Sequence, residues 1–144
     1  MARYSAGMTA AGAGTTLRPI FGLLNTASIA GLLREVSLWN TTAVACTYRL
    51  VELTAGTAGA TVAAHKYRDN APPALVLAKQ LWTADATIGE DTGYRFVLGA
   101  QIGAAAILTF GDPGVEADLG ATSALGLVPV GTGQVCEVCF VWDE

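Results

Sequence analysis

The stretch that most constrains the fold runs from Leu32 to Leu53 and reads LLREVSLWNTTAVACTYRLVEL. Apolar and polar residues alternate through both of its halves, and β-branched and aromatic residues are frequent. A period of two in residues of this kind indicates β-strands. Asn40 and two threonines separate the halves, and an asparagine side chain can hydrogen-bond its own backbone in a turn. The stretch therefore predicts two strands joined by a tight turn.

Short apolar runs bounded by turn residues continue through the rest of the chain, and none has the length and period of a helix. The expected strands include Ile20–Leu24, Ala74–Trp82, Tyr94–Leu98, Ala105–Phe110, Leu125–Val130 and Gln134–Trp142. We expect seven to nine strands, of which Tyr94–Leu98 and Ala105–Phe110 should be buried and Gln134–Trp142 central. Many short strands in 144 residues predict an all-β fold, a single-domain antiparallel β-sandwich that is jelly-roll-like.

The first residues differ in character from the rest of the chain. Glycine, alanine and threonine dominate the segment as far as Thr16, and Pro19 pushes Arg18 towards an extended conformation. We expect residues 1–24 to form an N-terminal arm and a first extended segment, followed by a β-sandwich domain at residues 25–144. An arm that orders against a neighbouring subunit is one interpretation, and a frayed terminus before an ordinary first strand is the other.

The composition indicates a protein partner rather than nucleic acid. Hydrophobic residues make up 52% and charged residues 14%, against roughly 45–50% and about 25% in an average soluble domain. Exposed apolar surface usually marks an interface, although alanine and glycine can also form neutral surface. The net charge of −4 gives no general attraction to nucleic acid. We therefore expect the chain to self-associate as a homo-oligomer.

Two of the three cysteines, Cys136 and Cys139, have the C-x-x-C spacing of redox and zinc motifs. They lie in an extended run, in which residues three apart are roughly 10 Å apart and point to opposite faces. A disulfide needs Cα atoms within about 7 Å of each other. The pair should neither form a disulfide nor chelate one ion, so we expect these cysteines to pack as small hydrophobic residues.

No set of residues predicts a reaction, so we expect no enzyme, no catalytic residues, no metal site and no cofactor. His65 is the only histidine, and no G-x-S-x-G motif accompanies it. The acidic loop around Asp85, Glu90 and Asp91 lacks the spacing of a calcium loop. The uncharged run from Phe96 to Gly111 has 16 residues, fewer than the about 20 needed to cross a bilayer. No membrane segment and no secretory signal are expected.

The segments LREVSLWNTT, LTAGTAGA, GYRFVLGAQIGAAAILTFGDPG and GTGQVCEVCFVWDE occur in this order. In this arrangement the chain resembles small virion structural proteins of tailed bacteriophages, and capsid decoration (cement) proteins are the nearest in size and character. The resemblance implies a jelly roll or related β fold that links neighbouring subunits of the major capsid protein, commonly as a dimer or trimer. It also implies a location on the capsid surface of the virion, after synthesis in the host cytoplasm.

Two other functions fit the same composition. One is a tail, neck or fibre-associated virion protein, and the other is a carbohydrate-binding β-sandwich that would present aromatic residues on one face. For the decoration protein, Arg and Tyr are residue types enriched at interface anchors, and the N-terminal segment carries such residues among small ones. The predicted protein-interface residues are Arg3, Tyr4, Arg18 and Phe21.

Overall fold

The computed structural model describes the whole chain, residues 1–144, and contains ten β-strands and no helix. The strands are β1 (Arg3–Thr9), β2 (Phe21–Leu24), β3 (Leu32–Asn40), β4 (Cys46–Ala55), β5 (His65–Lys66), β6 (Leu77–Gln80), β7 (Thr87–Leu98), β8 (Ala105–Thr109), β9 (Ala124–Pro129) and β10 (Cys136–Asp143). The number exceeds the expected seven to nine because β1 and the two-residue β5 were not predicted as strands.

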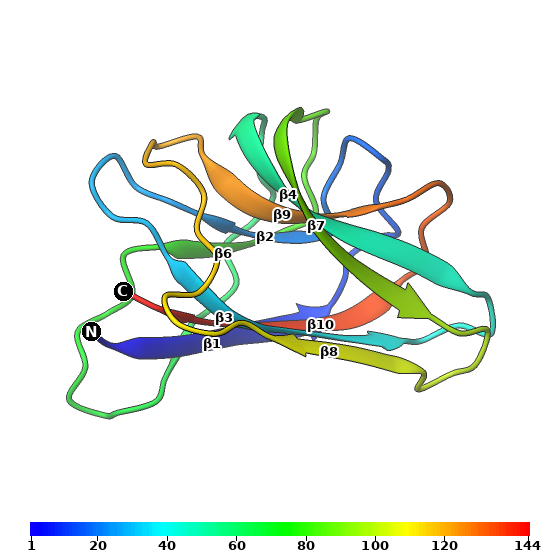
Figure 1. Cartoon of the computed structure of the whole chain (residues 1–144), viewed down its shortest axis with the longest axis horizontal. Coiled ribbons are helices and arrows are strands. Elements are labelled where there is room, and N and C mark those ends of the chain that lie inside the picture. Colours follow the sequence, from blue (N-terminus) through cyan, green and yellow to red (C-terminus); the bar gives the residue numbers. More distant parts are fainter.

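The strands form two five-stranded antiparallel sheets that pack face to face (Figure 1). The first sheet has the order β5-β1-β10-β3-β8 and the second β6-β2-β9-β4-β7. Apart from the short strands β5 and β6, the chain crosses from one sheet to the other at every connection except that from β4 to β7. This is the strand order of a jelly roll. The predicted all-β, single-domain antiparallel β-sandwich is confirmed.

The predicted pairing of the two strands in Leu32–Leu53 is wrong, although both strands exist. β3 lies between β10 and β8 in the first sheet, whereas β4 lies between β9 and β7 in the second. The five residues between them carry the chain across the sandwich. No two strands that are consecutive in the sequence are neighbours in either sheet. The alternation identifies which face of each strand is apolar, but it does not identify the partner strand.

The expected N-terminal arm is instead strand β1 of the sandwich. β1 pairs with β10 along its whole length, from Arg3 opposite Asp143 to Thr9 opposite Glu137. Its inward side chains are buried, with Tyr4 1% exposed. Gly7 allows close packing here, because a Cβ atom at this position would lie 2.7 Å from a carbonyl oxygen of β10. Residues 1–24 therefore belong to the same domain as residues 25–144.

The inward faces of the two sheets enclose a cluster of 24 buried residues. The Tyr4 ring stacks on Trp142 with the ring centroids 5.8 Å apart. Phe21 of the second sheet meets Phe140 of the first edge to face at 5.1 Å. Strand β10 lies between β1 and β3, as predicted for a central strand, and its Cys136 belongs to this core. Cys139 faces outward and is half-buried, so the predicted opposite orientation of the two thiols is confirmed.

A second apolar cluster covers the outer face of the second sheet. It consists of Val51, Leu53, Trp82, Ala86, Ala124 and Val128. Trp82 lies directly over Gly22 of β2, where a Cβ atom would be 2.6 Å from the indole ring. The backbone N–H of Trp82 donates a hydrogen bond of 3.0 Å to the Pro19 carbonyl, which ties the segment after β6 to the segment before β2. Loops of the chain thus cover part of this face.

Candidate protein-binding surface

The structure does not bring the four sequence-predicted interface residues together. Tyr4 and Phe21 are 1% and 0% exposed and belong to the core, so neither offers its side chain to a partner. The Tyr4 hydroxyl donates a hydrogen bond of 2.9 Å to the Pro72 carbonyl. The sequence predicted Tyr4 and Phe21 as anchors for another protein. Their large side chains instead pack between the two sheets of this chain.

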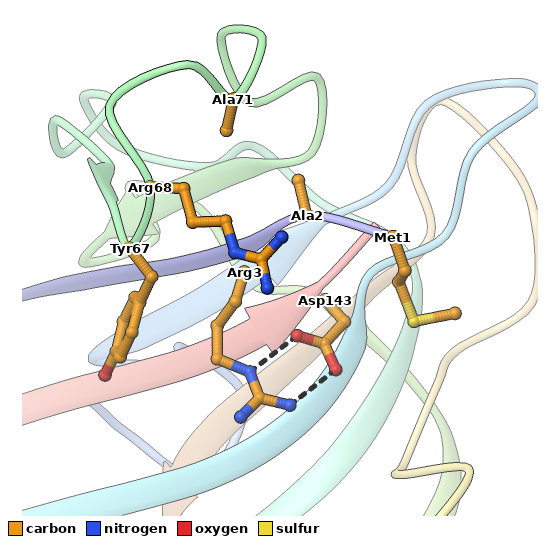
Figure 2. Close-up of a pocket in the computed structure, with 7 residues that line it drawn as sticks. All are labelled: Met1, Ala2, Arg3, Tyr67, Arg68, Ala71 and Asp143. Carbon is orange, nitrogen blue, oxygen red and sulfur yellow. Dashed lines mark hydrogen bonds and ion pairs between the residues drawn. The ribbon is translucent and has the colours of Figure 1, made fainter.

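Arg3 of β1 binds Asp143 of β10 (Figure 2), and Asp143 joins three strands because Arg34 of β3 binds it as well. The Arg3 guanidinium donates two hydrogen bonds, of 2.7 and 2.8 Å, to the carboxylate of Asp143 in β10. Arg34 of β3 donates a third, of 2.7 Å, to the same carboxylate. The pKa of Asp143 lies below its usual value, mainly because of the hydrogen bond from Arg3. Burial of the carboxylate acts in the opposite direction and raises this pKa. These contacts give Arg3 a structural role.

A cleft of about 450 Å³ opens beside this ion cluster, lined by residues that include Arg3, Tyr67 and Arg68 (Figure 2). Arg68 reaches towards Arg3 from the loop after β5. Arg18, the fourth predicted interface residue, lies in the exposed loop before β2 and pairs with Asp85 at 2.7 Å. An exposed ion pair of this kind contributes little to stability or binding.

The β3–β4, β7–β8 and β9–β10 connections lie at the end of the sandwich away from the chain termini (Figure 1). These connections and the adjoining end of β7 carry exposed aliphatic side chains. We call this surface the apolar end and define it by Val44, Val97, Ile102 and Val130. Their exposed fractions are 52%, 69%, 70% and 49%. Single exposed aliphatic residues are normal, but a contiguous group usually marks a contact with another molecule.

Asn40 fixes two loops of the apolar end. Its side-chain amide donates hydrogen bonds to the carbonyl of Val44 at 2.7 Å and to that of Gly99 at 3.0 Å. Its side-chain oxygen accepts the N–H of Thr42 at 3.0 Å. Asn40 is 1% exposed, so these bonds are sheltered from water. The predicted turn chemistry of Asn40 is confirmed, and it also connects the β3–β4 loop to the β7–β8 loop.

The sheet itself presents the other part of the apolar end. Val97 of β7 lies opposite Thr47 of β4, and the N–H of Val130 donates a hydrogen bond of 2.8 Å to the Thr47 carbonyl. Tyr48, the next residue of β4, points into the core. Thr47 therefore points outward, and Val97 and Val130 lie on either side of it on the outer face of the second sheet.

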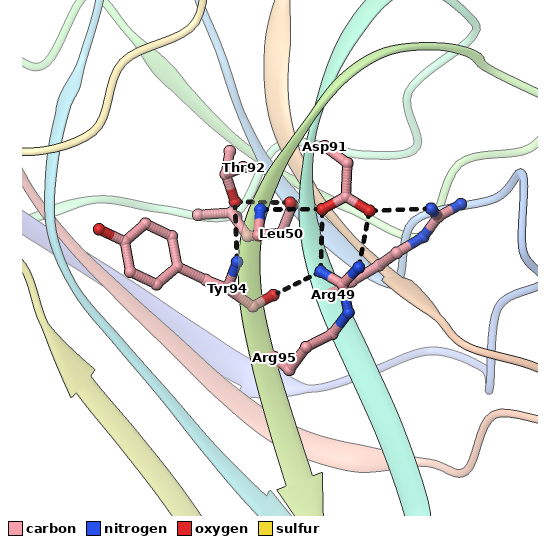
Figure 3. Close-up of polar contacts among 7 residues, drawn as sticks. Arg49, Leu50, Asp91, Thr92, Tyr94 and Arg95 are labelled. Carbon is pink, nitrogen blue, oxygen red and sulfur yellow. Dashed lines mark hydrogen bonds and ion pairs between the residues drawn. The ribbon is translucent and has the colours of Figure 1, made fainter.

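Charged residues border this apolar row (Figure 3). Asp91 accepts two hydrogen bonds of 2.8 Å from the Arg95 guanidinium and one of 3.1 Å from Arg49. The N–H of Gly93, which has a φ of +83°, adds a bond of 2.9 Å. The pKa of Asp91 lies far below its usual value, mainly because of the hydrogen bonds from Arg95. Two arginines share one carboxylate, so the border carries a positive charge and free N–H donors.

An apolar centre with an arginine-containing polar rim is the usual anatomy of a protein–protein interface. This surface does not follow from the sequence if Tyr94–Leu98 and Ala105–Phe110 are expected to be buried strands. That expectation is wrong for six of their eleven residues, which are exposed. β7 and β8 are the edge strands on one side of the sandwich, and Val97 and Ile107 face outward, 69% and 54% exposed. Their alternation with Phe96, Leu98 and Leu108 was the available signal.

The three tryptophans do not share a face. Trp142 is 0% exposed in the core, and Trp82 is 3% exposed under the loops of the second sheet. Trp39 is half-buried on the outer face of the first sheet, beside Glu137 and Ala105. A flat aromatic platform, on which sugar rings could stack, is therefore not assembled from these residues.

Comparisons with protein-family models, curated proteins and solved structures find no match for this chain. No group of three or more His, Cys, Asp or Glu side chains is arranged to hold a metal ion. The structure has no helix with the length and apolarity needed to cross a membrane.

Proposed function

We propose that this chain is a structural protein of a tailed-bacteriophage particle, which decorates the capsid and links neighbouring subunits of the major capsid protein. The observation that carries the proposal is the apolar end, bordered by Arg49 and Arg95. A surface of this kind suits a flat protein partner better than a small molecule, because its aliphatic side chains are spread over a strand and three loops rather than gathered in a pocket.

The geometry of the surface supports a linking role. Asn40 fixes two of the three loops through side-chain hydrogen bonds, so little conformational entropy is lost when a partner covers them. A decoration protein stabilises a shell only if each unit contacts more than one capsid subunit, because several weak contacts then act as one multivalent attachment. Self-association of the chain would supply the additional contacts.

Binding can be tested by co-sedimentation with phage capsids assembled without this chain. We expect Val97→Lys to weaken capsid binding by about tenfold or more, since it places a charge on the apolar end. Leu119→Lys is the matched control, because Leu119 is also exposed, at 59%, but lies in a different loop. Equal binding by both variants would exclude the apolar end, and no sedimentation of the wild-type chain would count against the capsid as partner.

A tail, neck or fibre-associated virion protein could use the same surface. Electron microscopy of intact particles labelled with an antibody against this chain separates the two locations. Label over the whole shell supports decoration, whereas label confined to the tail or neck contradicts it.

A further inference from the structure

Each sheet of a sandwich has two edge strands, whose free backbone groups can pair with another chain unless they are protected. Two of the four edge strands are protected, β5 because it is short and β6 because another segment of the chain covers it. β5 has only two residues, His65 and Lys66, with polar side chains. β6 is covered by the preceding segment, through hydrogen bonds from Val62 to Ala78 at 2.9 Å and from Gln80 to Ala60 at 3.1 Å.

The third edge, β7, is protected by irregularity and charge. Its pairing with β4 shifts register at three places, and Gly93 has a left-handed φ of +83°. It also carries Glu90, Asp91 and Arg95. Bulges and charges of this kind prevent edge-to-edge pairing, because they bend the strand and would be desolvated by a neighbour.

The fourth edge, β8, has none of these protections. Its sequence AAILT contains no charge, no proline and no glycine, and its pairing with β3 is regular over all five residues. Ala105, Ile107 and Thr109 are exposed, with Ile107 at 54%. β8 is therefore an edge of the sandwich at which another strand can pair with five regularly spaced residues without removing a charge from water.

The hydrogen bonds at the ends of β8 determine which backbone groups are free. The N–H of Phe110 donates to Arg34 and the carbonyl of Ala104 accepts from Asn40, both at 2.8 Å. Residues 104, 106, 108 and 110 thus direct their backbone groups towards β3, since these groups alternate in direction along a strand. The N–H and C=O groups of Ala105, Ile107 and Thr109 point away from the sheet.

We propose that two copies of this chain pair through β8, antiparallel to each other around a two-fold axis at Ile107. In this register Ile107 lies opposite its own copy, and Ala105 lies opposite Thr109 of the second copy. The three residues with free backbone groups then lie opposite the same three residues of the second copy. Every outward N–H of one copy therefore meets a carbonyl of the other. The two first sheets join into one continuous sheet of ten strands.

The free backbone groups of β8 are complementary to those of its own copy, and charge at this edge does not oppose a second copy as its occupant. Each copy has a net charge of −4, so most ways of bringing two copies together place acidic surfaces near each other. The β8 contact brings together only uncharged side chains, and Ile107 gains an apolar neighbour across the axis. Five-residue pairing buries less area than a permanent dimer interface, so we expect a dissociation constant in the micromolar range.

This inference rests on the self-association proposed above, and not on the identity of the capsid partner. Sedimentation equilibrium between about 1 and 300 µM measures it, the range being chosen to span a micromolar dissociation constant. We expect the wild-type chain to dimerise and Ile107→Lys to weaken dimerisation by about 30-fold or more, because two ammonium groups would meet at the axis. Leu119→Lys, with the same change of charge, should dimerise as the wild type does.

A cross-link tests the register directly. In a Cys139→Ser background, Ile107→Cys places two thiols on Cα atoms about 5.5 Å apart across the axis, within disulfide range. Air oxidation should then give a covalent dimer, whereas Ile102→Cys, which is more exposed, should give little.

A wild-type chain that stays monomeric at 300 µM would overturn the dimer, and so would dimerisation unaffected by Ile107→Lys. Equal cross-linking at positions 102 and 107 would overturn the register. Co-sedimentation of the monomeric variant with capsids is scored separately, so failure of the dimer is distinguishable from failure of capsid binding.

Discussion

Replacing Trp82 with alanine should destabilise the whole sandwich, although Trp82 lies outside the space between the two sheets. The side chain is 3% exposed and covers Gly22, where no other side chain fits. Val51, Leu53 and Val128 of the second sheet surround it. Its removal would leave a cavity over β2 and would expose the outer face of the sheet to water.

The expected loss can be calculated from the burial of the side chain. A buried tryptophan removes about 150–250 Å² from water, which corresponds to about 4–6 kcal/mol at about 25 cal/mol per Å². Measured losses for Trp→Ala in cores are about 3–5 kcal/mol. We expect the free energy of unfolding to fall by about 4 kcal/mol, because the covering loops can collapse only partly onto Gly22. This corresponds to a decrease in Tm of about 15 °C for a domain of this size.

Urea unfolding followed by circular dichroism measures this change, with an expected decrease of about 2 M in the midpoint. Trp82→Phe should lose less, since a phenyl ring fills part of the site, and Leu119→Ala should change the free energy of unfolding by less than about 0.5 kcal/mol. A loss below about 1 kcal/mol for Trp82→Ala would refute the buried position. It would also restore Trp82 as an aromatic residue available to a sugar ring.

Three further predictions follow from burial and pairing. Deleting residues 2–16 should abolish cooperative thermal unfolding, because it removes β1 and the side chain of Tyr4 from the core; a truncated chain that keeps its circular dichroism spectrum and a cooperative transition would contradict this. Burial raises the pKa of the Cys136 thiol from 9.0 to about 12. Between these pH values the folded state keeps a proton that the unfolded state loses. The free energy of unfolding should therefore fall as the pH rises from about 9 to about 12. Urea unfolding at several pH values should show a shallower fall for Cys136→Ala. Asp143→Asn should lower the Tm at pH 7 by about 5 °C. It should also remove part of the loss of stability below pH 4, because the pKa of Asp143 is lowered in the folded state and the carboxylate stabilises the fold until it is protonated. Identical dependence of stability on acid pH in the variant and the wild type would refute this prediction.

The proposed capsid contact and the proposed dimer use different parts of one region. The apolar end lies on the second sheet and on the two loops that Asn40 holds, whereas the dimer contact is the edge of the first sheet. A dimer through β8 would therefore leave the outer face of each second sheet free. Two capsid-binding surfaces on one dimer would give the multivalent attachment that a decoration protein needs.

Local sequence pattern was enough to predict most of the strands and the buried faces of β3, β4 and β10. Alternation in β3, β4 and β10 predicted which side chains point inward, because successive side chains of a strand point to opposite sides whatever the partner strand is. It also predicted that Cys136 and Cys139 face opposite ways. These inferences need only the local backbone geometry, and the structure confirms them.

Only the tertiary structure decided which strands pair, which are edges and which apolar residues remain exposed. Strand partners depend on contacts between residues far apart in the sequence, such as Arg3 with Asp143, and alternation carries no information about them. β1 resembled part of a flexible arm because it lies in a segment that is dominated by alanine, glycine and threonine as far as Thr16. Gly7, which lets β10 approach closely, also favours disorder. Val97 and Ile107 resembled core residues because the sequence records their apolarity, whereas their position at the edge of a sheet is a property of the assembled sandwich.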